Sequence, residues 1–403
     1  MADFGGDLDA FRAEARSWLE ANFPPSLKGK SGFGYIEDAS PDDADFKAWT
    51  KAMGDKGWGV PTWPAQYGGG GLSREQARVL QQEMQRAGAW NPIGGMGTMM
   101  FGPTLLEYGN EAQKQQHIRA IARQEVRWCQ GFSEPGAGSD LASLQCKAED
   151  KGDHYLVNGS KIWTSGGQWA DMCFCLVRTD TTKKHEGISF LLIDMHDPGV
   201  EVRPIRLIAG ASPFCETFFT DVKVPKENLV GPLNGGWTIA KRLLQHERSG
   251  IGGGGSGGGG GNNIFGVGGS PAASAKTYVG LDEAGRIDDP DLRSRVTQHQ
   301  MESRAFMLTL MRAAAEAKAG NGPSAAISIM KNAGSKVSQD RAELTLEIMG
   351  QQGLGWEGEG FQADEISAVR TWLGGKAFTI FGGSYEIQNN IISKRVLGLP
   401  DHQ

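Results

Sequence analysis

The most specific stretch of this sequence is WCQGFSEPGAGSDLAS, residues 128–143, which is followed by NGSKIWTSGG at residues 158–167. The first stretch supplies small residues, hydroxyl groups and accessible backbone amides, which can approach a flat polar cofactor and its phosphates closely. In the second, Trp163 offers an aromatic face, and Thr164 and Ser165 offer hydrogen-bond donors. Either stretch alone is explained most simply as a glycine-rich turn between strands, whereas the two together indicate a cofactor site.

The chain before this stretch has helical periodicity. Apolar residues recur on one helical face from Leu8 to Leu19, and this helix is expected to end before Pro24. A second apolar pattern over residues 46–53 is expected to end at Gly54. Further helix starts are predicted at Ser73, which forms a capping box with the residue three positions later, and at Asn110. We therefore expect an α-helical domain over residues 1–127.

The periodicity changes to two after Cys129 and returns to helical after Gly236. Short runs rich in β-branched and aromatic residues predict strands at 155–165, 172–179, 188–194 and 200–205. Helical patterns then cover residues 237–248, 293–318 and 325–349. The predicted fold class is α+β, with a barrel-like or sandwich β-domain over residues 128–232 and a helical domain over residues 233–403.

Composition excludes several classes of protein. The chain has 403 residues and a formal net charge of −6, which argues against a general nucleic-acid binder. It contains no apolar run of about 18 residues and begins without the pattern of a signal peptide, so we expect a cytoplasmic protein without a membrane span. The five cysteines are odd in number and form no CxxC pair, which favours buried free thiols and no metal site.

Six ordered motifs resemble those of the acyl-CoA dehydrogenase family over essentially the whole chain. They are PAQYGGGG (64–71), GPTLLEYGN (102–110), SEPGAGSD (133–140), NGSKIWTSGG (158–167), PKENLVG (225–231) and IFGGSYEIQNNIISKRVLGLP (380–400). The resemblance implies a helical domain, a β-domain and a C-terminal four-helix bundle with FAD between them. It also implies oxidation of an acyl-CoA to the trans-2-enoyl-CoA, with the electrons passed to an electron-transfer flavoprotein.

The resemblance also implies which residues contact the cofactor and the substrate. Phe132 and Ser133 should line the pyrimidine side of the flavin, Gly138 and Ser139 should approach the flavin and its phosphates, and Trp163 and Ser165 should flank the ring. Two C-terminal stretches should reach the adenosine and pyrophosphate of the FAD: Glu347, Gly350 and Gln351, which come from a neighbouring subunit, and Ser384 with Glu386. Substrate contacts are expected from Ser139, Arg248, Phe381 and Gly382.

A cofactor site completed by a neighbouring subunit implies at least a dimer. We expect a homo-oligomer, dimer or tetramer, or a heterotetramer. The family's Arg-x-x-Phe-Gly stretch, whose arginine reaches the partner's FAD, is not visible in this sequence. GLDEAGRIDDPDLRSRV stands in its place at residues 280–296, so Arg286, Arg293 and Arg295 are the candidates, and none of them is singled out.

The family reaction needs a carboxylate that takes the α-proton next to the thioester. Desolvation must raise the pKa of this group toward the working pH. Many family members carry the base in Ile-Tyr-Glu-Gly-Thr, but here residues 380–384 place Gly382 at that position. A subset of the family carries it before an arginine that follows the β-domain, where this chain has His246-Glu247-Arg248. We therefore predict Glu247 as the base.

Two alternatives concern the carboxylates. Glu247 could merely pair with Arg248 or a neighbouring helix, as most helical glutamates do, and His246 and Arg248 are better explained as packing or ion-pair residues. Glu386 lies four residues after Gly382, about one helical turn, and a cofactor or structural role fits it better than catalysis. The backbone N–H of Gly382 remains available to bind the thioester carbonyl.

Ten glycines lie between Gly250 and Gly261. They resemble a flexible linker, but the family pattern places them on a long helix from Trp237 to about Ala275 that forms one wall of the acyl pocket. There they would cost roughly 8–10 kcal/mol of helix stability relative to alanine. Missing side chains would widen the pocket for a branched, aromatic or steroid-like acyl group. The C-terminal motif likewise resembles the bacterial branch that includes sterol side-chain dehydrogenases, some of them heterotetramers.

Two further functions remain open on the sequence. One is a non-catalytic FAD-binding subunit that supports a competent partner, which Gly382 and the missing arginine stretch favour and Glu247 opposes. The other is a relative that performs different flavin chemistry on a CoA ester, such as desulfination or nitroalkane oxidation.

Overall fold

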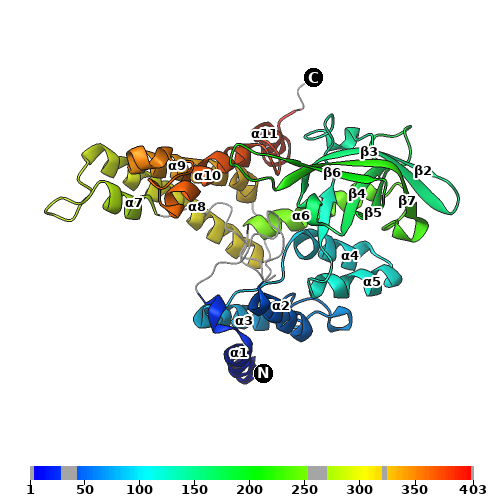
Figure 1. Cartoon of the computed structure of the whole chain (residues 1–403), viewed down its shortest axis with the longest axis horizontal. Helices are drawn as coiled ribbons and strands as arrows, with labels where there is room; N and C mark the ends of the chain where they lie inside the picture. The colour runs from blue at the N-terminus through cyan, green and yellow to red at the C-terminus, as the bar shows by residue number, and fades with distance from the viewer. Residues whose placement is uncertain (1–3, 29–42, 253–269, 320–324, 401–403) are drawn as a thin grey trace. The chain divides into compact units, whose positions relative to one another are not determined.

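The computed structural model describes residues 4–28, 43–252, 270–319 and 325–400, and among these it leaves the side chains of residues 4–6, 247–252, 317–318 and 325 undescribed. The chain divides into two compact units (Figure 1). The first contains residues 1–206 and 212–261, and the second contains residues 207–211 and 262–403. The predicted order of helices, then a sheet, then helices is confirmed.

The first unit begins with helices α1 (Phe4–Asn22), α2 (Ala44–Lys56), α3 (Arg74–Ala87), α4 (Gly102–Tyr108) and α5 (Glu111–Ala122). Both predicted helix starts carry capping boxes: Ser73 accepts from the backbone N–H of Gln76, and Asn110 accepts from that of Gln113. These caps satisfy N–H groups that have no partner inside the helix.

The predicted end of α2 at Gly54 is wrong. The helix continues to Lys56 and is terminated by Gly57, which has a left-handed φ of 71°. Gly54 is buried inside the helix, and a Cβ there would lie 3.0 Å from the Cα of Arg123. The glycine at 54 therefore permits close packing against the end of α5, whereas Gly57 supplies the conformation that ends the helix.

A single sheet follows, with the strand order β1-β4-β2-β3-β7-β6 and β5 paired to β4. Its strands are β1 (Trp128–Gly131), β2 (Lys147–Asp150), β3 (His154–Ser165), β4 (Met172–Arg178), β5 (Ile188–Asp194), β6 (Val200–Ile205) and β7 (Phe214–Pro225). All five cysteines are free and buried, as predicted, and four of them lie on strands of this sheet.

Strands β4 and β5 are buried on both faces, which explains why their sequences are nearly continuously apolar. Phe174 and Phe190 belong to a core shared with the helices, whereas Cys175 and Leu191 belong to the core on the opposite face. Alternate residues of each strand thus serve different cores, because successive side chains point to opposite faces.

Helix α6 (Gly236–Gly252) follows the sheet and belongs to the first unit. Its buried residues Ile239, Ala240 and Leu243 share the core that contains Phe190 of β5. Gly236 allows the start of the helix to contact the backbone of Ser189 on β5, because a Cβ at 236 would lie 2.5 Å from it. The first two glycines of the run, Gly250 and Gly252, are helical, and residues 253–269, where the predicted long helix would continue, lie outside the described residues.

The second unit contains α7 (Pro271–Tyr278), α8 (Pro290–Lys318), α9 (Met330–Met349), α10 (Ala363–Gly375) and α11 (Tyr385–Ile391). The predicted helix over 325–349 is shorter than expected, since residues 325–329 form a 3₁₀ turn before α9. Ala275, Val296 and Leu344 bring α7, α8 and α9 together in one core. In the described part of the chain, no helix is long and apolar enough to span a membrane.

Candidate flavin and substrate site

A β-bulge on strand β3 displays Trp163. The pairing of β3 with β7 shifts register between Lys161 and Thr164. Within this bulge Trp163 has a φ of 61° and its side chain is 53% exposed, with its ring edge-on to that of Phe214 at 6.1 Å. A bulky residue at positive φ costs on the order of 1–3 kcal/mol, so the surrounding structure must impose this conformation. An exposed aromatic face of this kind can stack on a flat cofactor ring.

A buried ion pair holds the bulge to the 132–134 segment. The side chain of Lys161 is fully buried, and its Nζ lies 2.7 Å from Oε1 of Glu134 and donates to the Phe132 carbonyl at 3.2 Å. The Ser133 carbonyl accepts from the Ile162 N–H at 2.9 Å. The 132–134 segment and the bulge around Trp163 are both predicted to contact the flavin. These hydrogen bonds and the buried ion pair therefore hold the two segments together.

Glu134 also organises the turn that follows it. Its carboxylate accepts from the backbone N–H groups of Gln145 at 2.6 Å and Cys146 at 2.9 Å. Its own backbone exchanges two hydrogen bonds of 3.0 Å with Ala137, which closes a tight turn. Each acceptor of this buried carboxylate is thus matched by a donor, as a buried charge requires.

The tip of this turn presents open backbone. Gly136, Gly138 and Ser139 are exposed, and a Cβ at either glycine would have no atom within 4 Å. Phe132, in contrast, packs its ring edge-on against Phe174 and Phe190 in the core, so it would meet a cofactor through its backbone. The open turn and the exposed Trp163 together fit a planar cofactor that carries phosphates.

In the second unit, one predicted cofactor stretch lies at the end of α9. Glu347 pairs with Arg295 of α8, so one of the three candidate arginines lies beside a residue predicted to reach the FAD. Arg286 instead pairs with Asp282, and Arg293 donates to the Ile287 carbonyl. Gly350 follows with a φ of 58° and open space around it, and Gln351 is exposed.

The other predicted stretch of this unit lies at the start of α11. Ser384 caps the helix by accepting from the Ile387 N–H, and its hydroxyl lowers the pKa of the exposed Glu386. Just before it, Gly382 and Gly383 have φ values of 65° and 92°. Glycine at 382 thus adopts a conformation that a glutamate there would reach only with strain.

The predicted base lies in the last turns of α6, whose side chains at 247 and 248 are outside the described residues. One turn earlier, Nε and Nη2 of Arg242 each donate to the carboxylate of Glu107 on α4 at 2.7 Å, and His246 Nε2 lies 3.2 Å from the same carboxylate. The hydrogen bond from Arg242 lowers the pKa of Glu107, and burial lowers that of His246. His246 therefore packs against the carboxylate of Glu107, which is consistent with the predicted packing or ion-pair role, and the Arg242–Glu107 pair joins α6 to α4 shortly before Glu247.

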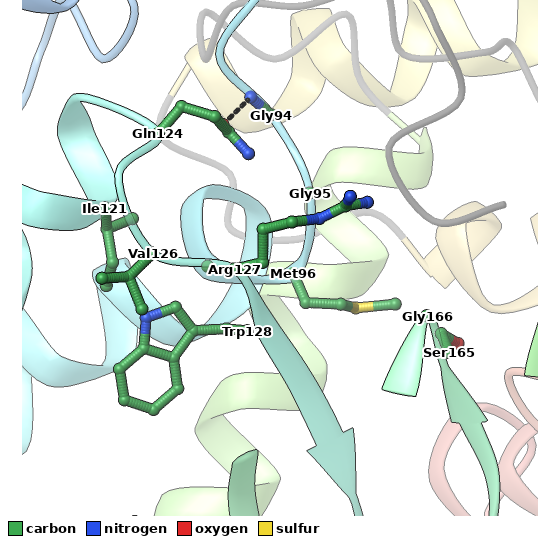
Figure 2. Close-up of a pocket in the computed structure, with 11 residues that line it drawn as sticks. Gly94, Gly95, Met96, Ile121, Gln124, Val126, Arg127, Trp128, Ser165 and Gly166 are labelled. Carbon is green, nitrogen blue, oxygen red and sulfur yellow. Dashed lines mark hydrogen bonds between the residues drawn. The ribbon is translucent and has the colours of Figure 1, made fainter. Parts of the chain in front are cut away.

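Ser165 and Gly166, at the end of β3, border a pocket that the sequence did not indicate (Figure 2). Its other walls come from residues 94–97 and from the end of α5 through the start of β1, including Gln124 and Arg127. Gln124 has a φ of 57°, a backbone feature that no sequence pattern signals.

Three family models match the chain: the acyl-CoA dehydrogenase N-terminal domain over residues 6–125, the middle domain over 129–222 and the C-terminal domain over 234–397. The acyl-CoA dehydrogenase IpdE1 of Mycobacterium tuberculosis is 35% identical in an alignment of 403 positions that covers 98% of this chain and 98% of that relative. The chain belongs to the acyl-CoA dehydrogenase family and is an oxidoreductase that acts on acyl-CoA.

Solved structures of steroid-type relatives also resemble this chain over nearly its whole length. The Tcur3481–Tcur3483 steroid ACAD has a TM-score of 0.74 and 29% identity, over 98% of each chain. The ChsE4–ChsE5 complex from Mycobacterium tuberculosis has a TM-score of 0.71 and 27% identity, over 100% of each chain. This chain therefore has relatives in the bacterial steroid branch of the family.

Proposed function

We propose that this protein is an FAD-dependent acyl-CoA dehydrogenase that converts a bulky acyl-CoA to its trans-2-enoyl-CoA and passes the electrons to an electron-transfer flavoprotein. The observation that carries the proposal is Trp163, which is held exposed at positive φ on a bulge bonded to residues 132–134, the segment that leads into the open turn at 136–139. Stacking on a planar ring would repay the cost of this conformation.

FAD supplies the acceptor for the hydride that leaves the β-carbon. In this chain, Trp163 and Ser165 would flank the ring, Ser133 would lie on its pyrimidine side, and Gly138 and Ser139 would contact phosphates. Glu347, Gly350, Gln351, Ser384 and Glu386 would hold the remaining part of the FAD, the first three of them from a neighbouring subunit. This arrangement requires a homodimer, a homotetramer or a heterotetramer.

Glu247 would remove the α-proton as the β-hydrogen leaves with its electron pair, so that the carbon–carbon double bond forms between them. Anchoring of α6 by the Arg242–Glu107 pair one turn earlier supports a fixed position for this carboxylate. The backbone N–H of Gly382 would donate to the thioester oxygen, where negative charge develops as the proton leaves. Arg248 and Phe381 would contact the substrate beside it.

A bulky acyl group is supported by the ten glycines of residues 250–261, which lack side chains that could fill an acyl pocket, and by the steroid ACAD among the related structures. A heteromeric assembly is supported by the ChsE4–ChsE5 complex, and a reducing, cytoplasmic location by the five buried free cysteines.

The direct test is an anaerobic titration of the purified flavoprotein with butyryl-, palmitoyl- and steroid-CoA esters. We expect the absorption band of oxidised flavin to bleach most completely and fastest with the steroid ester. Faster bleaching with the straight-chain esters would overturn the substrate class. No bleaching with any of the three would overturn dehydrogenation and favour a non-catalytic subunit.

A further inference from the structure

The turn between β6 and β7, residues 207–211, belongs to the second compact unit, although both strands belong to the first. Two hydrogen bonds of 2.9 Å close this β6–β7 turn. The Leu207 N–H donates to the Ala211 carbonyl, and the Gly210 N–H donates to the Leu207 carbonyl. Because Ile208 is 68% exposed, burial of that side chain does not hold the turn in place.

The ring of Trp356 packs against the backbone of the β6–β7 turn, within the second unit. A Cβ at Gly210 would lie 2.9 Å from this ring, and Gly210 has a φ of 89°. A side chain at 210 would therefore displace the ring and would also be strained. On α10, the guanidinium of Arg370 lies 5.1 Å from the centre of the Trp356 ring, an attraction that helps to hold the ring. The turn is thus fixed by an aromatic contact with its glycine.

The residues that follow the β6–β7 turn are bonded to the end of β3. The Pro213 carbonyl accepts from the Gly166 N–H at 2.8 Å, and the Ser212 carbonyl accepts from Nε2 of Gln168 at the same distance. The Cys215 thiol donates to the carboxamide oxygen of Gln168 at 2.6 Å. These three hydrogen bonds lie inside the first unit, so the start of β7 and the end of β3 hold one another in place.

The start of β7 also contacts residues that are predicted to flank the flavin. Phe214 is the register partner of Ser165 on β3, and its ring packs edge-on against that of Trp163 at 6.1 Å. Residues 211–213 alone separate Phe214 from Gly210. Because so short a connection has little slack, a displacement of Gly210 is transmitted to Phe214. The contact that fixes the turn therefore also limits the movement of the Trp163 ring.

We propose that Trp356 is a positioning residue for the flavin site. Its contact with Gly210 fixes the β6–β7 turn, and the turn holds Phe214 in place. Phe214 in turn keeps Trp163 and Ser165 in the orientation that the flavin ring requires. The proposal rests on the proposed function, which places these two residues beside the ring. The role assigned to Trp356 is indirect, because it acts through the backbone between the turn and β7.

Amide hydrogen exchange of the apoprotein tests this link without turnover. Trp356→Ala removes the ring, so we expect the Gly166 amide, which donates to Pro213, to exchange at least about tenfold faster. We also expect FAD to bind at least about tenfold more weakly, as measured by fluorescence titration. Trp356→Phe keeps an aromatic ring beside the turn and should restore most of both properties.

Trp372→Ala is the matched control, since Trp372 is also a partly buried tryptophan of the second unit, with Lys376 lying 4.6 Å from its ring centre. It should change neither the exchange of the Gly166 amide nor the FAD affinity. Gly210→Ala disturbs the same contact from the other side, because its Cβ would displace the ring, and we expect the same two effects. In the double variant of Gly210→Ala and Trp356→Ala, the effects should be less than additive, because both substitutions disrupt one contact.

The two proposals fail differently. If no acyl-CoA ester bleaches the flavin, the proposed dehydrogenation is wrong, whereas amide exchange and FAD binding still decide the role of Trp356. Wild-type exchange of the Gly166 amide, or wild-type FAD affinity, in Trp356→Ala would overturn the positioning role alone. Equal effects of Trp356→Ala and Trp372→Ala would also overturn it, because the cause would then be a general loss of stability in the second unit.

Discussion

At position 163 the backbone adopts a φ of 61° under a large, half-exposed aromatic side chain. Local propensity opposes this arrangement, because Cβ crowds the following carbonyl in the left-handed region. Residues that break a local rule in this way are expected at functional sites. The strain at Trp163 is therefore consistent with the flavin contact proposed for its ring.

Replacement of Trp163 by asparagine should separate stability from cofactor binding. Asparagine tolerates positive φ, so the apoprotein should keep its stability or gain up to about 1 kcal/mol, while FAD binds at least about tenfold more weakly. Urea unfolding of the apoprotein and fluorescence titration with FAD measure the two effects.

Asp221→Gly is the matched control for this variant, since Asp221 also has a positive φ, of 51°, on strand β7. It should relieve backbone strain without changing the FAD dissociation constant. Undiminished FAD binding by Trp163→Asn would remove the proposed role of the tryptophan.

A second residue-scale prediction concerns Glu247. Glu247→Gln keeps the shape of the side chain but cannot accept the α-proton, so kcat should fall by roughly 10²–10⁴-fold while FAD content is unchanged. Stopped-flow flavin reduction with the best ester measures the chemical step directly. Glu14→Gln, on the surface of α1, serves as the control and should reduce the flavin at the wild-type rate. If Glu247→Gln and Glu14→Gln reduce the flavin at equal rates, Glu247 is not the base and has only an ion-pair role.

At the scale of elements, single buried contacts join segments that are distant in the sequence. Lys161 and Glu134 tie strand β3 to the loop after β1, and Arg178 of β4 donates to the carbonyls of Ala142 and Lys184. Such links decide how the exposed turns are positioned, because the turns themselves have few apolar contacts.

Removal of Lys161 should destabilise the protein strongly. Lys161→Met leaves the carboxylate of Glu134 buried without its cation, at a cost of about 3–5 kcal/mol in urea unfolding of the apoprotein. The double variant Lys161→Met with Glu134→Gln removes both charges and should recover part of this loss, yet still bind FAD more weakly than the wild type. Wild-type FAD affinity in the double variant would mean that the pair stabilises the fold without positioning the flavin segments.

The contact between α1 and α3 predicts a pH dependence of stability. Glu83 of α3 is 3% exposed and lies within 3.1 Å of Arg12, Arg16 and Arg86. Hydrogen bonds from Arg16 lower the pKa of Glu83 most, and those from Arg86 and Arg12 lower it further. Burial raises the pKa in part, and the net result is a decrease from 4.5 to about 2. Because the folded pKa lies below the unfolded one, this stabilisation is fully present above pH 4.5 and is lost as the pH falls toward 2.

Glu83→Gln should therefore be less stable than the wild type by about 2 kcal/mol at pH 7, and the difference should shrink between pH 4.5 and pH 2. Urea unfolding at a series of pH values measures it. Glu20→Gln removes an exposed partner of Arg86 and should cost less than about 1 kcal/mol at any pH. A pH-independent difference for Glu83→Gln would indicate a packing effect instead of an ion pair.

At the scale of the whole molecule, the family's C-terminal domain model begins at residue 234, although α6 is part of the first compact unit. Residues 207–211, just after β6, conversely belong to the second unit, where a Cβ at Gly210 would lie 2.9 Å from the ring of Trp356. The chain thus passes between the units more often than a simple division into consecutive domains predicts.

The whole-molecule prediction concerns assembly. If residues 347–351 complete the cofactor site of a neighbour, the protein should have a mass at least twice that of one chain, and FAD should be lost when it dissociates. Light scattering with simultaneous flavin absorbance across a dilution series measures both. A monomer that retains stoichiometric FAD would contradict a shared cofactor site.

Much of the fold followed from local signals. Capping boxes at Ser73 and Asn110 predicted helix starts, because a side chain three residues away satisfies the free N–H groups. Gly54 was misleading, since close packing against Arg123 and helix termination both call for glycine and only the three-dimensional contact distinguishes them. Phe132 and Trp163 were both predicted to contact the flavin, but the structure buries the Phe132 ring in the core and leaves the Trp163 ring half exposed.

The sequence by itself determined the order of helices and strands, the cofactor-type turn at 133–140, and the absence of the usual glutamate at position 382. These properties reside in spacing and residue type along the chain. Only the tertiary structure decided that Trp163 is exposed at positive φ, that Lys161 and Glu134 join its strand to the 132–134 segment, and that the Gln124 side chain accepts from the Gly94 N–H. Each of these depends on contacts between residues that are distant in the chain, and no local pattern encodes such contacts.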